Sequence, residues 1–166
     1  MLKKYFDEDK YEELKNSDNL IYKSLEVVTK LFENDLDKSG MPYFLHLTYV
    51  YRHVSSIEEK VVALLHDIIE DKDVSSDDLL EIGFPEKIVQ DVLVLTRVRP
   101  MEYKDYIDQI IKKGSVEALH VKMVDLENNM DITRIHNPQM KDYERVEKRY
   151  RPAYEKIINR LKEIEK

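Results

Sequence analysis

The chain has 166 residues, of which 42% are hydrophobic and 37% charged, and its formal net charge is −7. This length and composition predict one folded domain over residues 1–166 with a sizeable core. The acidic balance excludes general binding to nucleic acid, which needs a basic surface. The absence of Cys excludes disulfides and thiolate chemistry. No apolar run is long enough for a membrane span, and the N-terminus lacks the apolar core of a signal peptide, so we expect a cytoplasmic protein without a membrane partner.

The predicted secondary structure is entirely helical. Only three Gly are present, and the apolar residues between chain breakers follow the helical period, which predicts an all-α bundle of about seven or eight helices. In chain order, the expected helices are 18–36, 42–54, 56–71, 76–82, 85–95, 102–113, 115–130 and one starting near 139. A capping box of Ser56 and Glu59 is expected to open the third. Pro152 is expected to kink or break the last, because it removes a backbone donor.

The helix expected over residues 56–71 contains four groups that can bind metal or carry protons: His66, Asp67, Glu70 and Asp71. At helical pitch, residues three and four apart lie on neighbouring strips of one surface. The surrounding residues are apolar, so this helix is expected to be largely buried. Buried imidazole and carboxylate groups cost desolvation energy unless something compensates them. A divalent cation would do so, and the segment therefore indicates metal-assisted chemistry.

Two other segments contribute candidate ligands. His46 follows a turn at residues 37–42, and Asp125 lies four residues before Asn129 near the end of a predicted helix. Two His and two Asp from three helices would make a mixed nitrogen and oxygen site, which suits Mn, Fe, Zn, Ni or Co better than Mg. Four protein ligands would leave coordination positions for water and substrate, as a hydrolase needs.

Four motifs in order resemble those of HD-domain metal-dependent phosphohydrolases, and among these the hydrolase domains of RelA/SpoT-type alarmone enzymes. The matching segments are GMPYFLH at 40–46, ALLHDIIED at 63–71, LT at 95–96 and KMVD at 122–125 with Asn129 following. The ordered matches cover about residues 38–131. Residues 94–106 and 130–154 also resemble a small stand-alone subgroup of HD proteins whose members are often labelled pyrophosphohydrolases by similarity.

The resemblance implies an all-α HD-domain fold and a bound divalent metal. In the family this metal is usually Mn²⁺, with Fe, Ni, Co or Zn as alternatives, and here its ligands would be His46, His66, Asp67 and Asp125.

The resemblance also implies roles for residues around the metal. Glu70 and Asp71 would form the acid–base pair that orients or deprotonates the attacking water, and a carboxylate one helical turn from the ligands is well placed to do so. Asn129 could hold a ribose or phosphate oxygen of the substrate. Lys38 and Lys122 are the candidates for binding substrate phosphate.

One residue departs from the pattern of the alarmone hydrolases. Asp37 stands where those enzymes have an Arg that stacks on the guanine base. An acidic group cannot supply cation–π stacking and is expected to repel phosphate. The family's upstream His-and-Gln pattern is also absent, with Phe32 and Asp35 in its place. The motifs therefore define the chemistry better than they define the substrate.

Several of these groups also have structural interpretations. His66 and Asp67 could form a buried ion pair, and Glu70 and Asp71 could be the acidic end of a helix. The charged residues of 144–149 are expected to form a solvated helical face. The other histidines are expected to be structural or surface residues: His53, His120 and His136.

The favoured function is a metal-dependent phosphohydrolase, by resemblance a pyrophosphohydrolase that uses metal-activated water on a nucleotide such as a (p)ppGpp-like compound. One alternative is a phosphatase or nucleotidase acting on a simpler phosphomonoester. The other is a non-catalytic HD sensor that binds nucleotide. The expected partner is a small phosphorylated molecule, with a homodimer left open.

Overall fold

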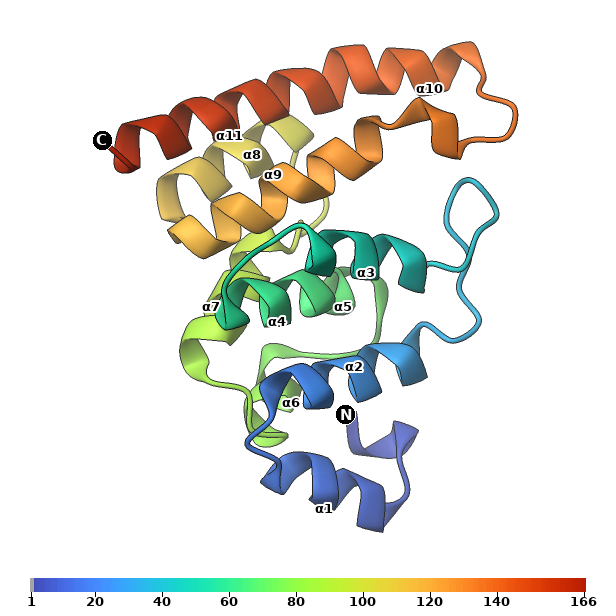
Figure 1. Ribbon diagram of the computed structural model, residues 1–166, viewed down its shortest axis with the longest axis vertical. Helices are drawn as coiled ribbons and strands as arrows, with labels where there is room; N and C mark the ends of the chain where they lie inside the picture. Colours follow the sequence, from blue (N-terminus) through green and yellow to red (C-terminus); the bar gives the residue numbers. More distant parts are fainter. Residues whose placement is uncertain (1) are drawn as a thin grey trace.

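Helices form the whole architecture of residues 2–166, which the computed structural model describes (Figure 1). These residues contain eleven α-helical segments and no strand, and eight of the segments span nine residues or more. The helices are α1 Glu8–Asn16, α2 Leu20–Leu31, α3 Phe44–Arg52, α4 Ile57–Leu65, α5 Ile68–Asp71, α6 Ser76–Glu81, α7 Glu86–Leu95, α8 Tyr103–Lys113, α9 Val116–Met130, α10 Met140–Arg145 and α11 Arg151–Ile164. In Figure 1 they form successive layers, from α1 and α2 through α3 and α4 to α8, α9 and α11.

Helix α2 ends earlier than the helix predicted over residues 18–36. A turn begins soon after Leu31: Asp37 N–H donates to Met41 O at 2.7 Å, and Tyr43 N–H donates to Asp35 O at 2.8 Å. These bonds engage the N–H of Asp37 and the carbonyl of Asp35 in the turn, so neither group is available to extend the helix. Gly40 occupies the left-handed region at φ +80°, a conformation that glycine adopts without strain. The turn brings residue 43 and helix α3 to the edge of the site described below.

The helix predicted over residues 56–71 is divided into two. The expected capping box is present, with Glu59 N–H donating to the Ser56 hydroxyl and the Glu59 carboxylate accepting from Ser56 N–H. Helix α4 ends at Leu65, however, and α5 starts only at Ile68. The intervening pair, His66 and Asp67, forms a turn that lets both side chains face one point, whereas adjacent residues of a continuous helix diverge.

Pro152 was expected to kink or break the last helix, but the helical run continues through it. Helix α10, the π-helical segment Val146–Tyr150 and α11 follow one another without a gap. Arg151 N–H donates to Val146 O, five residues back. The wider π turn immediately before Pro152 accommodates the missing donor and the bulk of the ring, so the helix continues past it.

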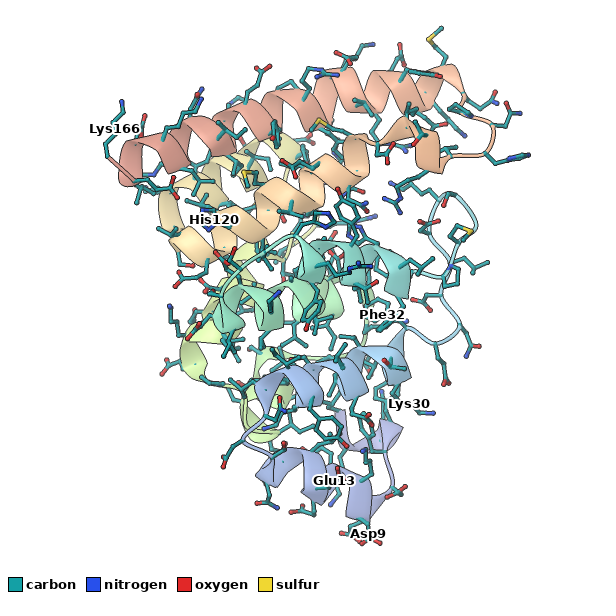
Figure 2. The ribbon with its side chains drawn as sticks, viewed as in Figure 1. Asp9, Glu13, Lys30, Phe32, His120 and Lys166 are labelled. Carbon is teal, nitrogen blue, oxygen red and sulfur yellow. The ribbon has the colours of Figure 1, made fainter. Side chains whose placement is uncertain are left out.

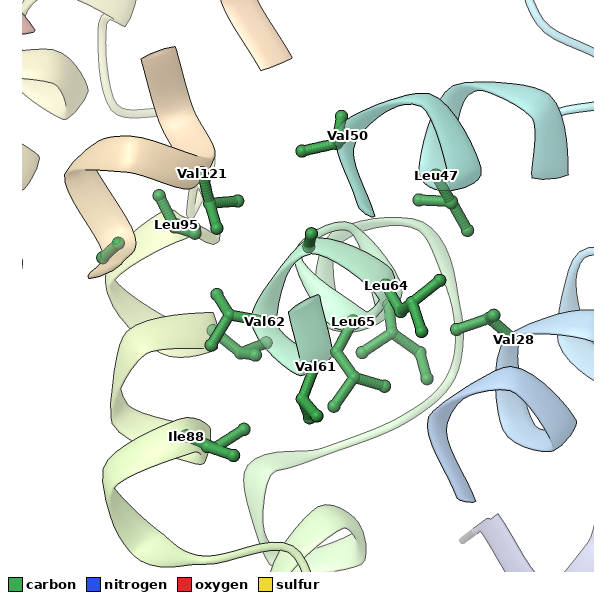
Figure 3. Packing of buried hydrophobic residues seen from close by; sticks show 14 of the residues in the cluster. Val28, Leu47, Val50, Val61, Val62, Leu64, Leu65, Ile88, Leu95 and Val121 are labelled. Atoms are coloured by element: carbon green, nitrogen blue, oxygen red, sulfur yellow. The ribbon is translucent and has the colours of Figure 1, made fainter. Parts of the chain in front are cut away.

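Helix α4 lies at the centre of the hydrophobic core. Its residues 61–65 are completely buried, and α2, α3, α7 and α9 pack against it. Figure 3 shows Val28, Leu47 and Val121 converging on it from three of those helices. The site residues that follow α4 are therefore anchored to a helix that is packed on several sides. No helix within residues 2–166 is long and apolar enough to cross a membrane.

Replacement of Leu65 by Ala should destabilise the fold. Leu65 is 0% exposed, so the substitution removes apolar contacts and leaves a cavity, at a cost of about 2 to 5 kcal/mol. Ile57→Ala at the start of the same helix is the control, because that side chain is 59% exposed and its loss should change stability by roughly 0.5 kcal/mol or less. Urea unfolding of both variants gives the comparison, and equal losses would contradict the assigned core.

Candidate metal centre

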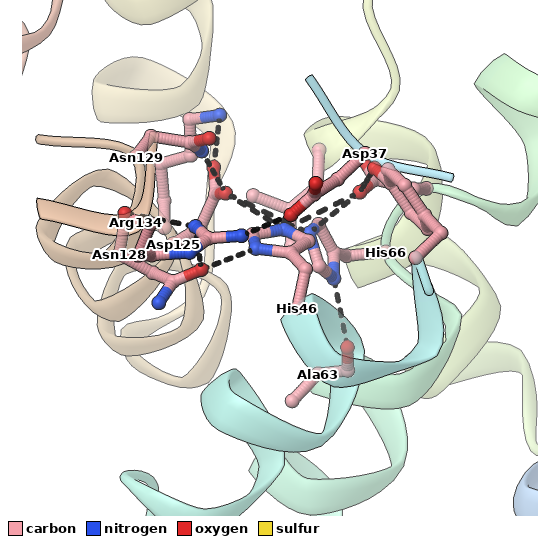
Figure 4. Close-up of polar contacts among 12 residues, drawn as sticks. Asp37, His46, Ala63, His66, Asp125, Asn128, Asn129 and Arg134 are labelled. Carbon is pink, nitrogen blue, oxygen red and sulfur yellow. Dashed lines mark hydrogen bonds and ion pairs between the residues drawn. The ribbon is translucent and has the colours of Figure 1, made fainter. Parts of the chain in front are cut away.

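Three buried side chains from different parts of the chain converge beside α4. His46 lies on α3, His66 in the turn after α4 and Asp125 on α9, and one ligand atom from each lies within 4.8 Å of the others (Figure 4). Asp125 Oδ1 is 3.3 Å from His46 Nε2 and 3.8 Å from His66 Nε2. Asp67 adds a fourth group, because its Oδ2 lies 3.0 Å from His66 Nε2 and 3.6 Å from His46 Nε2. The four predicted ligands are thus brought together.

Hydrogen bonds at the outer ring nitrogens orient both imidazoles. His46 Nδ1 lies 2.7 Å from the side-chain oxygen of Asn128, and His66 Nδ1 lies 2.7 Å from the carbonyl oxygen of Ala63. Because these oxygens are acceptors, each Nδ1 carries the proton and each Nε2 faces the cluster. His66 Nε2 is buried without a well-aligned hydrogen bond, although Asp67 is near. A buried nitrogen without a hydrogen bond that faces carboxylates has the environment that suits a metal ligand.

The two carboxylates are also held from behind. Tyr43 O–H donates to Asp67 Oδ2 at 2.5 Å. Lys122 Nζ donates to Asp125 Oδ2 at 2.8 Å, and Asn129 Nδ2 donates to Asp125 Oδ1 at 2.5 Å. Ligands fixed by such outer contacts need little reorganisation when they bind an ion. The donor set of two imidazoles and two carboxylates is compatible with a divalent metal.

The ionisation of the cluster follows from its burial and its mixed charges. Burial raises the pKa of Asp67, but His66 and then His46 outweigh it and lower that pKa to about 2. Burial likewise opposes ionisation of Asp125, yet Lys122 and the histidines hold its pKa below the usual value. Burial lowers the pKa of His66, and the two carboxylates raise it to about 9. Without an ion, His66 therefore carries a proton in the place where a cation would sit.

A cavity of about 370 Å³ opens beside the cluster. Of the residues predicted to act on substrate, Lys38, Glu70 and Asp71 are exposed and line it. Glu70 Oε2 accepts a hydrogen bond of 2.9 Å from the backbone N–H of Arg97. Partial burial, together with Asp67 and Glu70, raises the pKa of Asp71. Lys122 and Asn129 also line the cavity, but both already bond to Asp125.

The expectation that Asp37 repels phosphate treated its carboxylate as unpaired. Its carboxylate is paired with Arg134, whose Nη2 lies 2.6 Å from Asp37 Oδ2, so the acidic charge at the cavity wall is neutralised. The solvated face expected over residues 144–149 also needs correction. Arg145 and Arg149 line the cavity, and only the other three charged residues of this segment are exposed: Glu144, Glu147 and Lys148.

Sequence reasoning did not find three residues that shape this site. Tyr43 and Asn128 lie inside the quoted motifs or next to them, but their types gave no signal of contact with Asp67 and His46. Arg134 lies 97 positions from its partner Asp37, and no local pattern connects them. The remaining histidines lie outside the cavity, as expected. His53 bonds to Tyr49 O, and His120, near the C-terminal end of the chain in Figure 2, contacts Glu59 and Glu165.

Comparisons with known proteins place the fold. No family model matches the sequence. The structure is similar to the solved structure of a metazoan ortholog of SpoT that hydrolyzes ppGpp and plays a role in starvation responses. The TM-score is 0.70 at 20% sequence identity, over 87% of this chain and 86% of that chain. The chain thus shares the fold of that protein, and the predicted all-α HD-domain fold is confirmed. At this identity the likeness shows the fold alone.

The stability of the metal-free protein should depend on the protonation of His66. Its pKa of about 9 lies above its ordinary value of 6.5, so protonated His66 stabilises the metal-free protein fully below about pH 6.5. That contribution, on the order of 3 kcal/mol, should be lost as pH rises from about 6.5 to 9. Urea unfolding of chelator-treated protein across this range measures it. His66→Gln should abolish most of the pH dependence, and the exposed control His53→Gln should retain it; an unchanged slope in His66→Gln would contradict the assignment.

Proposed function

We propose that this protein is a divalent-metal-dependent phosphohydrolase of the HD superfamily. The observation that carries the proposal is the pair of buried imidazoles, His46 and His66, whose Nε2 atoms face two carboxylates at the wall of a cavity. The fold shared with a ppGpp-hydrolysing SpoT ortholog supports it. The favoured reaction is pyrophosphohydrolysis of a nucleotide such as a (p)ppGpp-like compound.

The proposed metal ligands are His46, His66, Asp67 and Asp125. A divalent ion bound there would supply Lewis acidity toward water and a phosphoryl oxygen. The resemblance to the HD family favours Mn²⁺, and the mixed ligand set also suits Fe, Ni, Co or Zn. The protein supplies the orientation: each imidazole is fixed through Nδ1, and each carboxylate through a second donor.

Glu70 and Asp71 are the proposed proton-handling pair. Both line the cavity from α5, three and four residues after the proposed ligand Asp67. The raised pKa of Asp71 supports a role as the proton donor, and the Arg97 N–H fixes the Glu70 carboxylate as an acceptor. One carboxylate that accepts the proton of the attacking water and one that protonates the leaving oxygen complete a hydrolytic step.

Basic groups around the same cavity would bind the substrate. Lys38 is an exposed cation on the turn between α2 and α3 and is proposed to contact phosphate. Lys122 and Asn129 each hold Asp125 with one donor. Their remaining polar atoms are proposed to reach a phosphate or ribose oxygen of the substrate in the same cavity.

Turnover with Mn²⁺ on a nucleotide panel tests the function. We expect pyrophosphate release from ppGpp or a nucleotide with a similar 3′-diphosphate, and little release from p-nitrophenyl phosphate. Asp67→Ala should lower both bound Mn²⁺ and turnover, because it removes one of four ligands. Inorganic phosphate as the only product would favour a phosphatase or nucleotidase. Nucleotide binding without any product would favour a sensor, and unchanged metal content in Asp67→Ala would refute the metal site.

Replacement of the acid–base pair should separate chemistry from metal binding. Glu70→Gln combined with Asp71→Asn keeps the size of both side chains and removes their proton affinity. We expect kcat to fall by about 10² to 10⁴, with Mn²⁺ content retained. Asp73→Asn is the matched control, because Asp73 lies just beyond α5 and its side chain is 81% exposed. A double variant with the wild-type rate would exclude these two residues from catalysis.

A further inference from the structure

Arg134 connects two sides of the cavity that the sequence keeps far apart. It ends the short 3-10 helix Ile132–Arg134 that follows α9. Its Nη1 donates to the backbone carbonyl of Asn128 at 3.0 Å and also to the Asn128 side-chain oxygen. Its Nη2 donates to Asp37 Oδ2 at 2.6 Å on the turn before α3. Figure 4 shows Arg134 beside Asn128, with Asp37 across the cluster.

The Asn128 side-chain oxygen serves two donors. It accepts from Arg134 Nη1 and from His46 Nδ1, the latter at 2.7 Å. The guanidinium has donors only, so it requires the oxygen rather than the amide nitrogen of Asn128 at this position. That oxygen in turn requires a proton on His46 Nδ1, which leaves Nε2 directed at Asp125. Arg134 therefore selects the tautomer of His46 without touching it.

Asp37, at the other end of this connection, is also held by several hydrogen bonds. Asp37 Oδ1 accepts from Ser39 N–H at 2.8 Å, from the Ser39 hydroxyl and from Met41 N–H at 3.1 Å, which shapes the turn that carries Lys38. Its Oδ2 is left for Arg134. Asp37 Oδ1 therefore orders the turn, and Asp37 Oδ2 anchors the guanidinium of Arg134.

We infer that Arg134 is a positioning residue that, anchored by Asp37, holds Asn128 and His46 in the orientation that directs His46 Nε2 at the metal site. The inference rests on the proposed function only in that this nitrogen is taken to bind metal. Asp37 then acts as a fixed support for the site rather than as a defect in substrate recognition. Because coupling between two sites is reciprocal, metal on His46 should also order the turn at residues 37–42.

Two substitutions break the connection at different points. Arg134→Met removes every donor while keeping an unbranched side chain. Asp37→Asn can keep the Oδ1 bonds of the turn, but it sets an amide N–H group against Arg134 Nη2. The first measurement is the Mn²⁺ dissociation constant without substrate. We expect Arg134→Met to raise it about tenfold or more, as loss of an outer partner of a metal-binding His does, and Asp37→Asn to raise it less.

The double variant tests whether the two residues act along one route. If they do, Asp37→Asn should add nothing to Arg134→Met, whereas independent effects would add. The matched controls are Arg151→Met and Glu147→Gln, which break an exposed Arg–Glu pair of 2.9 Å outside the cavity and should leave Mn²⁺ affinity unchanged. Circular dichroism of each variant tests whether it is folded. If Arg134→Met does not fold, the Mn²⁺ affinity and the His46 tautomer of Asp37→Asn alone test the inference.

The tautomer of His46 gives a readout independent of metal and of catalysis. Nitrogen-15 NMR of the metal-free wild type should show His46 protonated at Nδ1, and both Arg134→Met and Asp37→Asn should shift His46 toward a mixture of tautomers. An unchanged tautomer, an unchanged dissociation constant in Arg134→Met, or additive effects in the double variant would overturn the inference. A protein that shows these changes but hydrolyses no nucleotide would refute the proposed function and leave the inference standing.

Discussion

The gathering of two buried imidazoles, one buried carboxylate and one half-buried carboxylate beside the apolar end of helix α4 is the constraint on which the rest of the structure depends. Ionised groups removed from water cost several kcal/mol each unless other charges and hydrogen bonds compensate them. Here every member has an outer partner: Asn128 and the Ala63 carbonyl for the imidazoles, Tyr43 and Lys122 for the carboxylates. The one atom without a proper partner, His66 Nε2, points into the middle of the cluster.

Those parts of the fold that depend on neighbouring residues were predictable from the sequence. The Ser56–Glu59 capping box and the start of helix α9 after Ser115 are set by contacts within one turn, and the apolar period identifies the buried faces. The break at His66 and Asp67 was not predictable, because both residues are tolerated within a helix. Continuation of the chain through Pro152 also required a π turn, for which the sequence carries no clear signal.

The candidate site divides in the same way. Its four proposed ligands are residue types that can bind metal, and they lie in recognisable motifs, so their identity could be inferred before their geometry. Partners such as Arg134 could not, because an Arg 97 residues from an Asp has no pattern that distinguishes it from a surface residue. Asp37 shows the consequence. From the sequence alone, the negative charge of Asp37 is expected to repel phosphate. In the structure, this carboxylate pairs with Arg134 at the cavity wall.

Charge at the cavity differs from the charge of the whole chain. The net charge of −7 excludes a surface that binds polyanions in general, yet seven basic residues line the cavity. Three of them are already paired with carboxylates: Lys122 with Asp125, Arg134 with Asp37 and Arg145 with Asp142. Within residues 2–166, the other four take part in no ion pair with a carboxylate: Lys38, Arg97, Arg99 and Arg149. A few unpaired basic side chains beside a bound metal would attract one phosphorylated molecule. The paired basic side chains fix the shape of the cavity that would admit this molecule.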